Sequence, residues 1–216
     1  MRPARPTAAE LGNNERFERL ELWPYNAFPP WLALHMSQTT WITAAYRVCL
    51  VSVPIASPAL AAACGCSFVL GFACVGAGLL VGRTVLPLVH EHVHALAYRL
   101  MGARNVRIRY GAGLRTAFCT APGEVLSGGQ FLVVALGPLL GVNTVLAVST
   151  VFARHGAVAL GLAGSLFVHL RGCRGDVGVL NYMWAHRGDR LFVFDEPVAA
   201  FGAFYRAKPP APDNPR

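Results

Sequence analysis

The sequence predicts an all-α membrane protein with about four transmembrane helices, a short β hairpin or strand in a cytoplasmic loop, and a short strand-like C-terminal tail. Of its 216 residues, 54% are hydrophobic and only 14% are charged, whereas soluble domains carry about 25% charged residues. Long apolar runs recur along the chain, and the arginines lie between these runs. The net charge of +8 is therefore better explained by membrane topology than by nucleic-acid binding, and we expect no nucleic-acid partner.

The start of the N-terminal segment, Met1 to Asn26, is polar and carries four arginines against four glutamates. It contains no apolar run of the kind found in a removable signal peptide. The whole segment before the first predicted crossing is residues 1–40. We therefore expect a cytoplasmic N-terminal segment, and we expect the first membrane helix to remain in the mature protein.

Apolar runs of membrane-spanning length make up the transmembrane domain, residues 41–184. A bilayer core about 30 Å thick needs about 20 apolar helical residues. Runs of at least that length predict crossings over residues 41–63, 68–100, 126–152 and 156–184. The second run is too long for an upright helix and is expected to tilt or kink near Gly82 and Pro87. Its division into 66–82 and 84–100 would give five crossings.

The distribution of arginines predicts which side of the membrane each loop occupies, because short cytoplasmic loops carry excess Lys and Arg. The loop after the second crossing holds Arg104, Arg107, Arg109 and Arg115, and the tail, residues 185–216, holds Arg187, Arg190, Arg206 and Lys208. The outer turns offer only Arg154. We therefore expect an integral protein of the cell membrane with both termini cytoplasmic. Five crossings would put the arginine-rich loop outside, so four are preferred.

Two extramembrane segments have strand-like patterns. Residues 106–110 alternate apolar side chains with Arg107 and Arg109, which is the period-2 pattern of a half-buried strand. The tail from Leu191 to Tyr205 is strand-like on both sides of a predicted turn at residues 195–197, and the Pro-rich end is expected to be disordered.

The residues most indicative of chemistry are His90, Glu91 and His94, which form the pattern H-E-x-x-H. Two histidines four apart share one helix face and can bind one Zn²⁺. Glu91 is then placed to take a proton from zinc-bound water and deliver it to the leaving amine. An ionisable group inside a membrane helix is costly and marks function. The alternative is a local polar cluster at a helix end. His92, on another face, is an alternative ligand.

Asp176 is the candidate for the third protein ligand that a catalytic zinc requires. It lies in a glycine-rich interruption of the fourth crossing, residues 171–178. His94 and Asp176 lie about six and eight residues from the cytoplasmic ends of their helices, or roughly 9 and 12 Å at 1.5 Å per residue. Their depths therefore match. The alternative is a buried salt bridge between Asp176 and Arg171 or Arg174.

Two further polar residues lie within the predicted crossings. His169, two helical turns before Asp176, is a candidate ligand, a hydrogen-bonding partner of the site or a packing residue. Asn143, with Gly137 and Pro138 in the third crossing, either stabilises an oxyanion or serves helix packing.

These motifs occur in a recognisable order: Leu88 to Ala95 around H-E-x-x-H, Gly102, Ala135-Leu136-Gly137-Pro138, Gly175-Asp176, and the tail Arg190 to Asp195. Over about residues 40–206 the chain resembles the putative zincin peptidase family of small membrane proteins related to the site-2 proteases. The resemblance implies His90, His94 and Asp176 as zinc ligands and Glu91 as the base. The Asn-Pro-x-Asp-Gly motif of true site-2 proteases is absent, and the loops leave no room for a PDZ-like domain.

The sequence therefore predicts a zinc-dependent intramembrane endopeptidase that cuts in or near transmembrane segments of other proteins. Its expected partners are a membrane-protein or peptide substrate and the lipid bilayer. One alternative is a membrane protein that binds metal for sensing or transport without catalysis, although Glu91 would then have no role. Another is a scaffold with a degenerate site.

Overall fold

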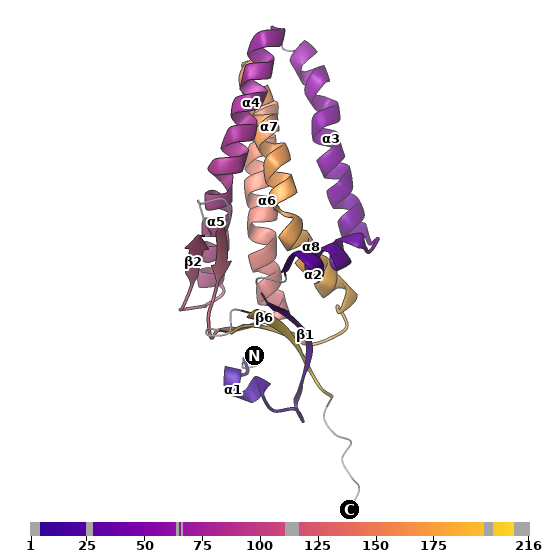
Figure 1. Cartoon of the computed structure of the whole chain (residues 1–216), viewed down its shortest axis with the longest axis vertical. Coiled ribbons are helices and arrows are strands. Elements are labelled where there is room, and N and C mark those ends of the chain that lie inside the picture. Colours follow the sequence, from indigo (N-terminus) through magenta and orange to yellow (C-terminus); the bar gives the residue numbers. More distant parts are fainter. Residues whose placement is uncertain are drawn as a thin grey trace, which may run out of the picture.

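A bundle of long helices stands on a small antiparallel sheet in the computed structural model (Figure 1). The structure describes residues 5–24, 28–63, 65, 67–110, 117–196 and 201–209. The helices are α1 (Ala8–Leu11), α2 (Phe28–Ser37), α3 (Trp41–Ala63), α4 (Phe68–Thr84), α5 (Leu86–Leu100), α6 (Gly128–Phe152), α7 (Gly156–Gly172) and α8 (Arg174–Ala185). The strands are β1 (Phe17–Pro24), β2 (Arg107–Tyr110), β3 (Ala117–Thr120), β4 (Val125–Ser127), β5 (Leu191–Asp195) and β6 (Phe201–Ala207).

One helix, α6, is by itself long and apolar enough to cross a membrane. Three more candidates are helix pairs bent at a short break. The pairs are Pro29–Ser37 with Trp41–Ser57, Phe68–Thr84 with Leu86–Leu100, and Gly156–Gly172 with Arg174–Ala185, bent by 98°, 42° and 47°. By length and composition, the described residues thus provide one clear span, and up to four if each bent pair is one span.

The second and fourth predicted crossings are therefore each two helices rather than one. The first breaks at Val85, between the predicted kink residues Gly82 and Pro87. Pro87 lies in the first turn of α5, where its missing N–H costs nothing. The second breaks at Cys173, where Gly172 ends α7 and Gly175 follows in α8. The bend at Val85 lies shortly before His90, and the bend at Cys173 lies shortly before Asp176.

Close packing of α4 against α7 depends on glycine. The Ser165 hydroxyl of α7 donates to the carbonyl of Gly78 in α4 at 2.9 Å. A Cβ on Gly78 would lie 1.9 Å from the carbonyl oxygen of Gly161. The two backbones therefore touch, as at other interfaces of small residues between membrane helices.

The four-stranded sheet has the order β1-β6-β5-β4, and every neighbouring pair is antiparallel. The two tail strands, β5 and β6, confirm the strand-like tail, whereas residues 197–200 of the connection between them lie outside the described residues. The all-α prediction needs correction here, because residues 17–24 form a strand that pairs with the tail. A register shift between Arg19 and Glu21 interrupts the alternation in β1, so the period-2 signal is missing from this segment.

A second, two-stranded sheet consists of β2 and β3, with Arg107 opposite Thr120 and Tyr110 opposite Ala117. The strand predicted at residues 106–110 is thus confirmed as part of a hairpin. The hairpin lies beside α5 (Figure 1). Residues 111–116 at its tip, including Arg115, lie outside the described residues.

The position of α8 is set by a fully buried amide. Asn181 donates from its Nδ2 to the backbone carbonyl of His35 in α2 at 2.8 Å, and its Oδ1 accepts from the Thr40 hydroxyl. One turn earlier, Gly178 lets α8 approach Leu32 of α2. The elbow between α2 and α3 therefore holds the helix that carries Asp176.

Candidate metal centre

His90 and His94 of α5 and Asp176 of α8 meet in the interior of the bundle. The two histidine Nε2 atoms are 3.1 Å apart. Asp176 Oδ2 lies 3.3 Å from His90 Nε2, and Asp176 Oδ1 lies 3.1 Å from His94 Nε2. His90 and Asp176 are each only 9% exposed. The structure thus brings together the three residues that the sequence analysis selected as ligands.

These separations fit a zinc ion. In a tetrahedral site with zinc bonds of about 2.0–2.1 Å, neighbouring ligand atoms lie about 3.3 Å apart, because a tetrahedron's edge is about 1.63 times its centre-to-corner distance. The two Nε2 atoms lie 3.1 Å apart, and each lies 3.1–3.3 Å from one of the two Asp176 carboxylate oxygens. One ligand atom from each of the three residues lies within 4.8 Å of the others, so the three residues are close enough to share one ion. The fourth corner is left for water or substrate, as in catalytic zinc sites.

The hydrogen bond on the far side of the His94 ring shows which nitrogen is available to a metal. His94 Nδ1 lies 3.0 Å from the carbonyl of Val134 in α6. A carbonyl only accepts, so Nδ1 carries the proton and Nε2 presents its lone pair. The buried Oδ2 of Asp176 accepts no hydrogen bond from the described residues. Acceptors thus face one another without a donor, and a bound cation would remove this repulsion.

The salt bridge considered as an alternative for Asp176 is not formed. Arg171 and Arg174 are both exposed. Among the described residues, the ion-pair contacts of Asp176 are with His90 and His94. The Asp176 carboxylate therefore points away from the arginines of its own segment and toward α5.

Glu91 and its neighbour His92 have different surroundings. The half-buried Glu91 carboxyl interacts with both histidines and with the backbone N–H of Cys119 in β3. His92 is exposed, and its Nδ1 lies 2.7 Å from the carbonyl of Leu88 on its own helix. His92 is therefore not brought to the cluster as an alternative ligand, whereas Glu91 adjoins it.

Behind the cluster lies a second polar layer that the sequence indicated only in part. His169 Nε2 is 3.2 Å from His90 Nδ1, and His169 Nδ1 is 2.8 Å from Asn143 Oδ1. The fully buried Cys173 thiol lies 3.6 Å from His169 Nδ1. Cys173 was not among the predicted site residues, although its place between Gly172 and Asp176 at the helix break indicated it. Asn143 accepts from His169 through Oδ1 and donates from Nδ2 to the Leu139 carbonyl of its own helix at 2.6 Å, so its amide N–H does not face the histidine cluster as an oxyanion donor would.

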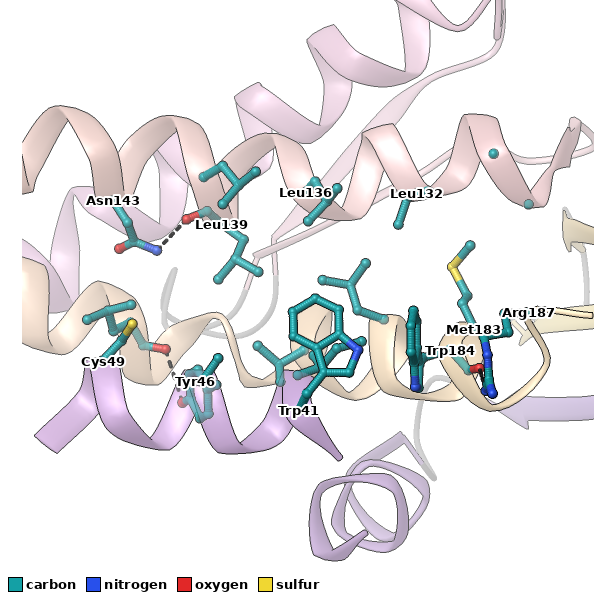
Figure 2. Close-up of a pocket in the computed structure, with 18 of the residues that line it drawn as sticks. Trp41, Tyr46, Cys49, Leu132, Leu136, Leu139, Asn143, Met183, Trp184 and Arg187 are labelled. Atoms are coloured by element: carbon teal, nitrogen blue, oxygen red, sulfur yellow. Dashed lines mark hydrogen bonds between the residues drawn. The ribbon is translucent and has the colours of Figure 1, made fainter. Parts of the chain in front are cut away.

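A groove with a volume of about 1190 Å³ lies between α3 and α6, with α8 behind it (Figure 2). Its walls are mainly apolar, and the Tyr46 hydroxyl within it already donates to the Leu170 carbonyl at 3.1 Å. Val177 and Leu180 of α8 line the groove, whereas Asp176 contacts the histidines of α5. The groove is therefore not centred on the histidine cluster, although Asn143, which contacts His169, also lines it.

Fold and site together describe a largely helical protein with a zincin-type arrangement of two histidines, a glutamate and an aspartate. Residues 84–189 match the model of a protein family described as "Putative zincin peptidase". All four residues, and also His169 and Cys173, lie within the matched range. The match supports a metallopeptidase that uses zinc. No curated protein and no solved structure matches the chain.

Proposed function

We propose that this protein is a zinc-dependent intramembrane endopeptidase that hydrolyses peptide bonds in or near transmembrane segments of other proteins. The observation that carries the proposal is the convergence of His90, His94 and Asp176, whose imidazole nitrogens and carboxylate oxygens lie 3.1–3.3 Å apart, with Glu91 next to His90 on the same helix. The helices that carry these residues belong to bent pairs apolar enough to cross a bilayer. A buried cluster of ionisable groups in such helices is costly and is explained by function.

His90, His94 and Asp176 would hold the ion through their Nε2 and carboxylate oxygen atoms. When bound, Zn²⁺ lowers the pKa of a ligated water and polarises the scissile carbonyl. Glu91 accepts the proton of the attacking water and delivers it to the leaving amine. The backbone N–H of Cys119 orients the Glu91 carboxylate for this transfer. A protein that only binds metal needs no such base, so Glu91 favours catalysis.

The hairpin provides a surface for presenting the peptide. β3 pairs with β2 along one edge, and the N–H of Cys119 reaches Glu91 from β3. An extended peptide added to the edge of β3 that faces α5 would pass Glu91 with its backbone hydrogen-bonded. A substrate helix must unwind to pair in this way, so the enzyme favours segments that unwind easily.

The membrane arrangement follows from the same elements. In this proposal α3, α6 and the bent pairs α4–α5 and α7–α8 cross the bilayer, with α2 and both termini on the cytoplasmic side. The turns α3–α4 and α6–α7 lie at one end of the bundle, and β1 and β6 lie at the other (Figure 1). The arginine-rich segments accompany the sheet and the hairpin, in agreement with the positive-inside rule. We also propose that the protein is related to the site-2 proteases.

The test is to co-express the protein with tagged single-pass membrane proteins and to follow their cleavage. Glu91→Gln should keep about one zinc per purified chain but lose cleavage, because the amide cannot accept the proton. His155→Ala, which removes an exposed histidine, is the matched control and should cut normally. Undiminished cleavage by Glu91→Gln, or purified wild type without zinc, would overturn the proposal.

A further inference from the structure

Two hydrogen bonds fix the orientation of the Asn143 amide in α6. Its Nδ2 lies 2.6 Å from the carbonyl oxygen of Leu139, one turn earlier (Figure 2). Since a carbonyl only accepts, the amide nitrogen must face Leu139, and the amide oxygen faces the other way. Asn143 Oδ1 therefore presents an acceptor to His169 Nδ1 at 2.8 Å. The side chain is 9% exposed, so little water can compete for this contact.

The Asn143 acceptor determines the tautomer of His169. His169 Nδ1 must carry the proton that Asn143 accepts, so neutral His169 has an unprotonated Nε2. That nitrogen lies 3.2 Å from His90 Nδ1 and accepts the hydrogen bond between the two rings. His90 Nδ1 therefore carries a proton, and His90 Nε2 is the nitrogen with a free lone pair. This is the nitrogen that faces His94 and Asp176.

We propose that His169, oriented by Asn143, is a positioning residue that holds the His90 ring in the one tautomer and orientation able to bind zinc through Nε2. The inference rests on the proposed function. For His94 the Val134 carbonyl accepts from Nδ1 in the same way. His90 has this imidazole acceptor instead, and His169 comes from α7, just before the helix break that presents Asp176.

His169 and Cys173 cover the side of the His90 ring that faces away from the metal site, and this position explains why they should affect zinc affinity. His169 is 3% exposed and Cys173 is fully buried, so water has little access to the far side of the His90 ring. Without the His169 acceptor, the polar neighbour left to His90 Nδ1 among the described residues is the Cys173 sulfur at 3.9 Å. Sulfur is a weak acceptor, so the His90 ring could take the other tautomer. Groups that orient ligating histidines in this way typically contribute 10–100-fold to metal affinity.

The experiment measures zinc affinity of the purified full-length protein by competition with a chromophoric chelator. His169→Leu removes the acceptor at similar bulk, and His169→Gln keeps an acceptor oxygen. We expect His169→Leu to raise the zinc Kd about 10–100-fold and His169→Gln to recover much of the loss. The absorption of bound Co²⁺ should change in His169→Leu and return toward wild type in His169→Gln.

A second pair of variants acts one step further from the ligand. Asn143→Leu should weaken zinc binding, and Asn143→Gln, which keeps an amide oxygen for His169 Nδ1 and an amide N–H for the Leu139 carbonyl, should recover part of the loss. This pair keeps the test decisive if His169→Leu does not fold. Two controls belong to the set: His155→Ala should leave the Kd unchanged, and Cys173→Ala should still bind one zinc per chain.

The outcomes separate this inference from the proposed function. If His94→Ala abolishes zinc binding while the Leu and Gln variants at 169 bind as tightly as each other, the positioning role is wrong and the proposed function stands. Two zinc ions in wild type and one in Cys173→Ala would make His169 a ligand of a second site with His90 and Cys173 and would also overturn the positioning role. Wild type without zinc would overturn both proposals.

Discussion

The contacts of Asp176 decide whether it is a salt-bridge partner of nearby arginines or a candidate metal ligand. Its neighbours in sequence, Arg171 and Arg174, offered a salt bridge, yet its carboxylate lies 3.1–3.3 Å from two histidine nitrogens of another helix. A carboxylate buried at this depth needs a cation. The two arginines are exposed and do not supply it. The protein therefore presents a carboxylate and two imidazoles to one point.

Replacement of the Asp176 carboxylate tests its role as a ligand. We expect Asp176→Asn to lose most of its bound zinc, because a neutral amide is a poor zinc ligand and leaves the charge of the ion less compensated. The measurement is zinc content after dialysis against a weak chelator. The double variant Arg171→Gln, Arg174→Gln should keep its zinc, and zinc loss there instead would return Asp176 to a structural role.

The two neighbouring histidines of the motif should respond differently. His94→Ala removes a nitrogen that faces the cluster, and we expect it to empty the site. His92→Ala removes an exposed ring bonded to the Leu88 carbonyl, and it should bind zinc like wild type. Equal loss of zinc in both variants would show that α5 itself, rather than a specific ligand, had been disturbed.

Contact between α4 and α7 depends on glycines, so a side chain added at the contact should destabilise the helix pair. Gly78→Ala should lower the unfolding temperature, because its Cβ would lie 1.9 Å from the Gly161 carbonyl and overpacking costs about 1–3 kcal/mol. Gly76→Ala, two residues earlier on the same helix, has no atom within 4 Å of the added Cβ and is the matched control. Thermal unfolding in one detergent compares them, and equal melting temperatures would exclude close contact at Gly78.

Pairing of the N-terminal strand with the tail should weaken in acid. A hydrogen bond from Arg206 lowers the pKa of Glu18, and hydrogen bonds from His186 and then Arg206 lower the pKa of Asp189. Carboxylates with lowered folded-state pKa values stabilise the fold above their ordinary values near 4 and lose this contribution as pH falls through the lowered values. Both groups are largely solvated, so the effect should be modest.

Hydrogen exchange of the β1 amides provides the measurement. Exchange should accelerate below about pH 4, beyond the chemical dependence of exchange on pH, relative to amides of α6. In Arg206→Met this extra acceleration should largely disappear, because both carboxylates lose their shared partner. An unchanged acid response in Arg206→Met would assign the acid sensitivity to other groups.

At the scale of the whole molecule, the proposed topology places one end of the bundle in the cytoplasm. We expect an epitope inserted in the turn at residues 153–155 to be digested by protease added outside intact cells. An epitope after β6 should be digested only after permeabilisation, because the basic segments lie at that end. The reverse pattern would invert the protein in the membrane. Digestion of both epitopes from outside would require an even number of crossings between these two positions, against the single crossing expected for α7 and α8.

Much of the fold could be predicted from local sequence. The long helices lie within the predicted apolar runs, and the hairpin strand follows the alternation at residues 106–110. The H-E-x-x-H spacing puts two histidines on one face of a helix because the helical repeat is local. Such features depend on residues only a few positions apart, so a single chain contains the information for them.

Other features could be decided only by tertiary structure, because they depend on residues that are distant in sequence. β1 and β6 pair although they lie near opposite ends of the sequence. The register shift in β1 interrupts the alternation of apolar and polar residues from which a strand could have been predicted. Whether Asp176 met arginines or histidines depended on how α8 turns after Cys173. The link from Asn143 through His169 to His90 joins three helices. The periodicity of a helix does not determine which side chains of different helices come into contact. The contacts among Asn143, His169 and His90 therefore depend on how the helices pack.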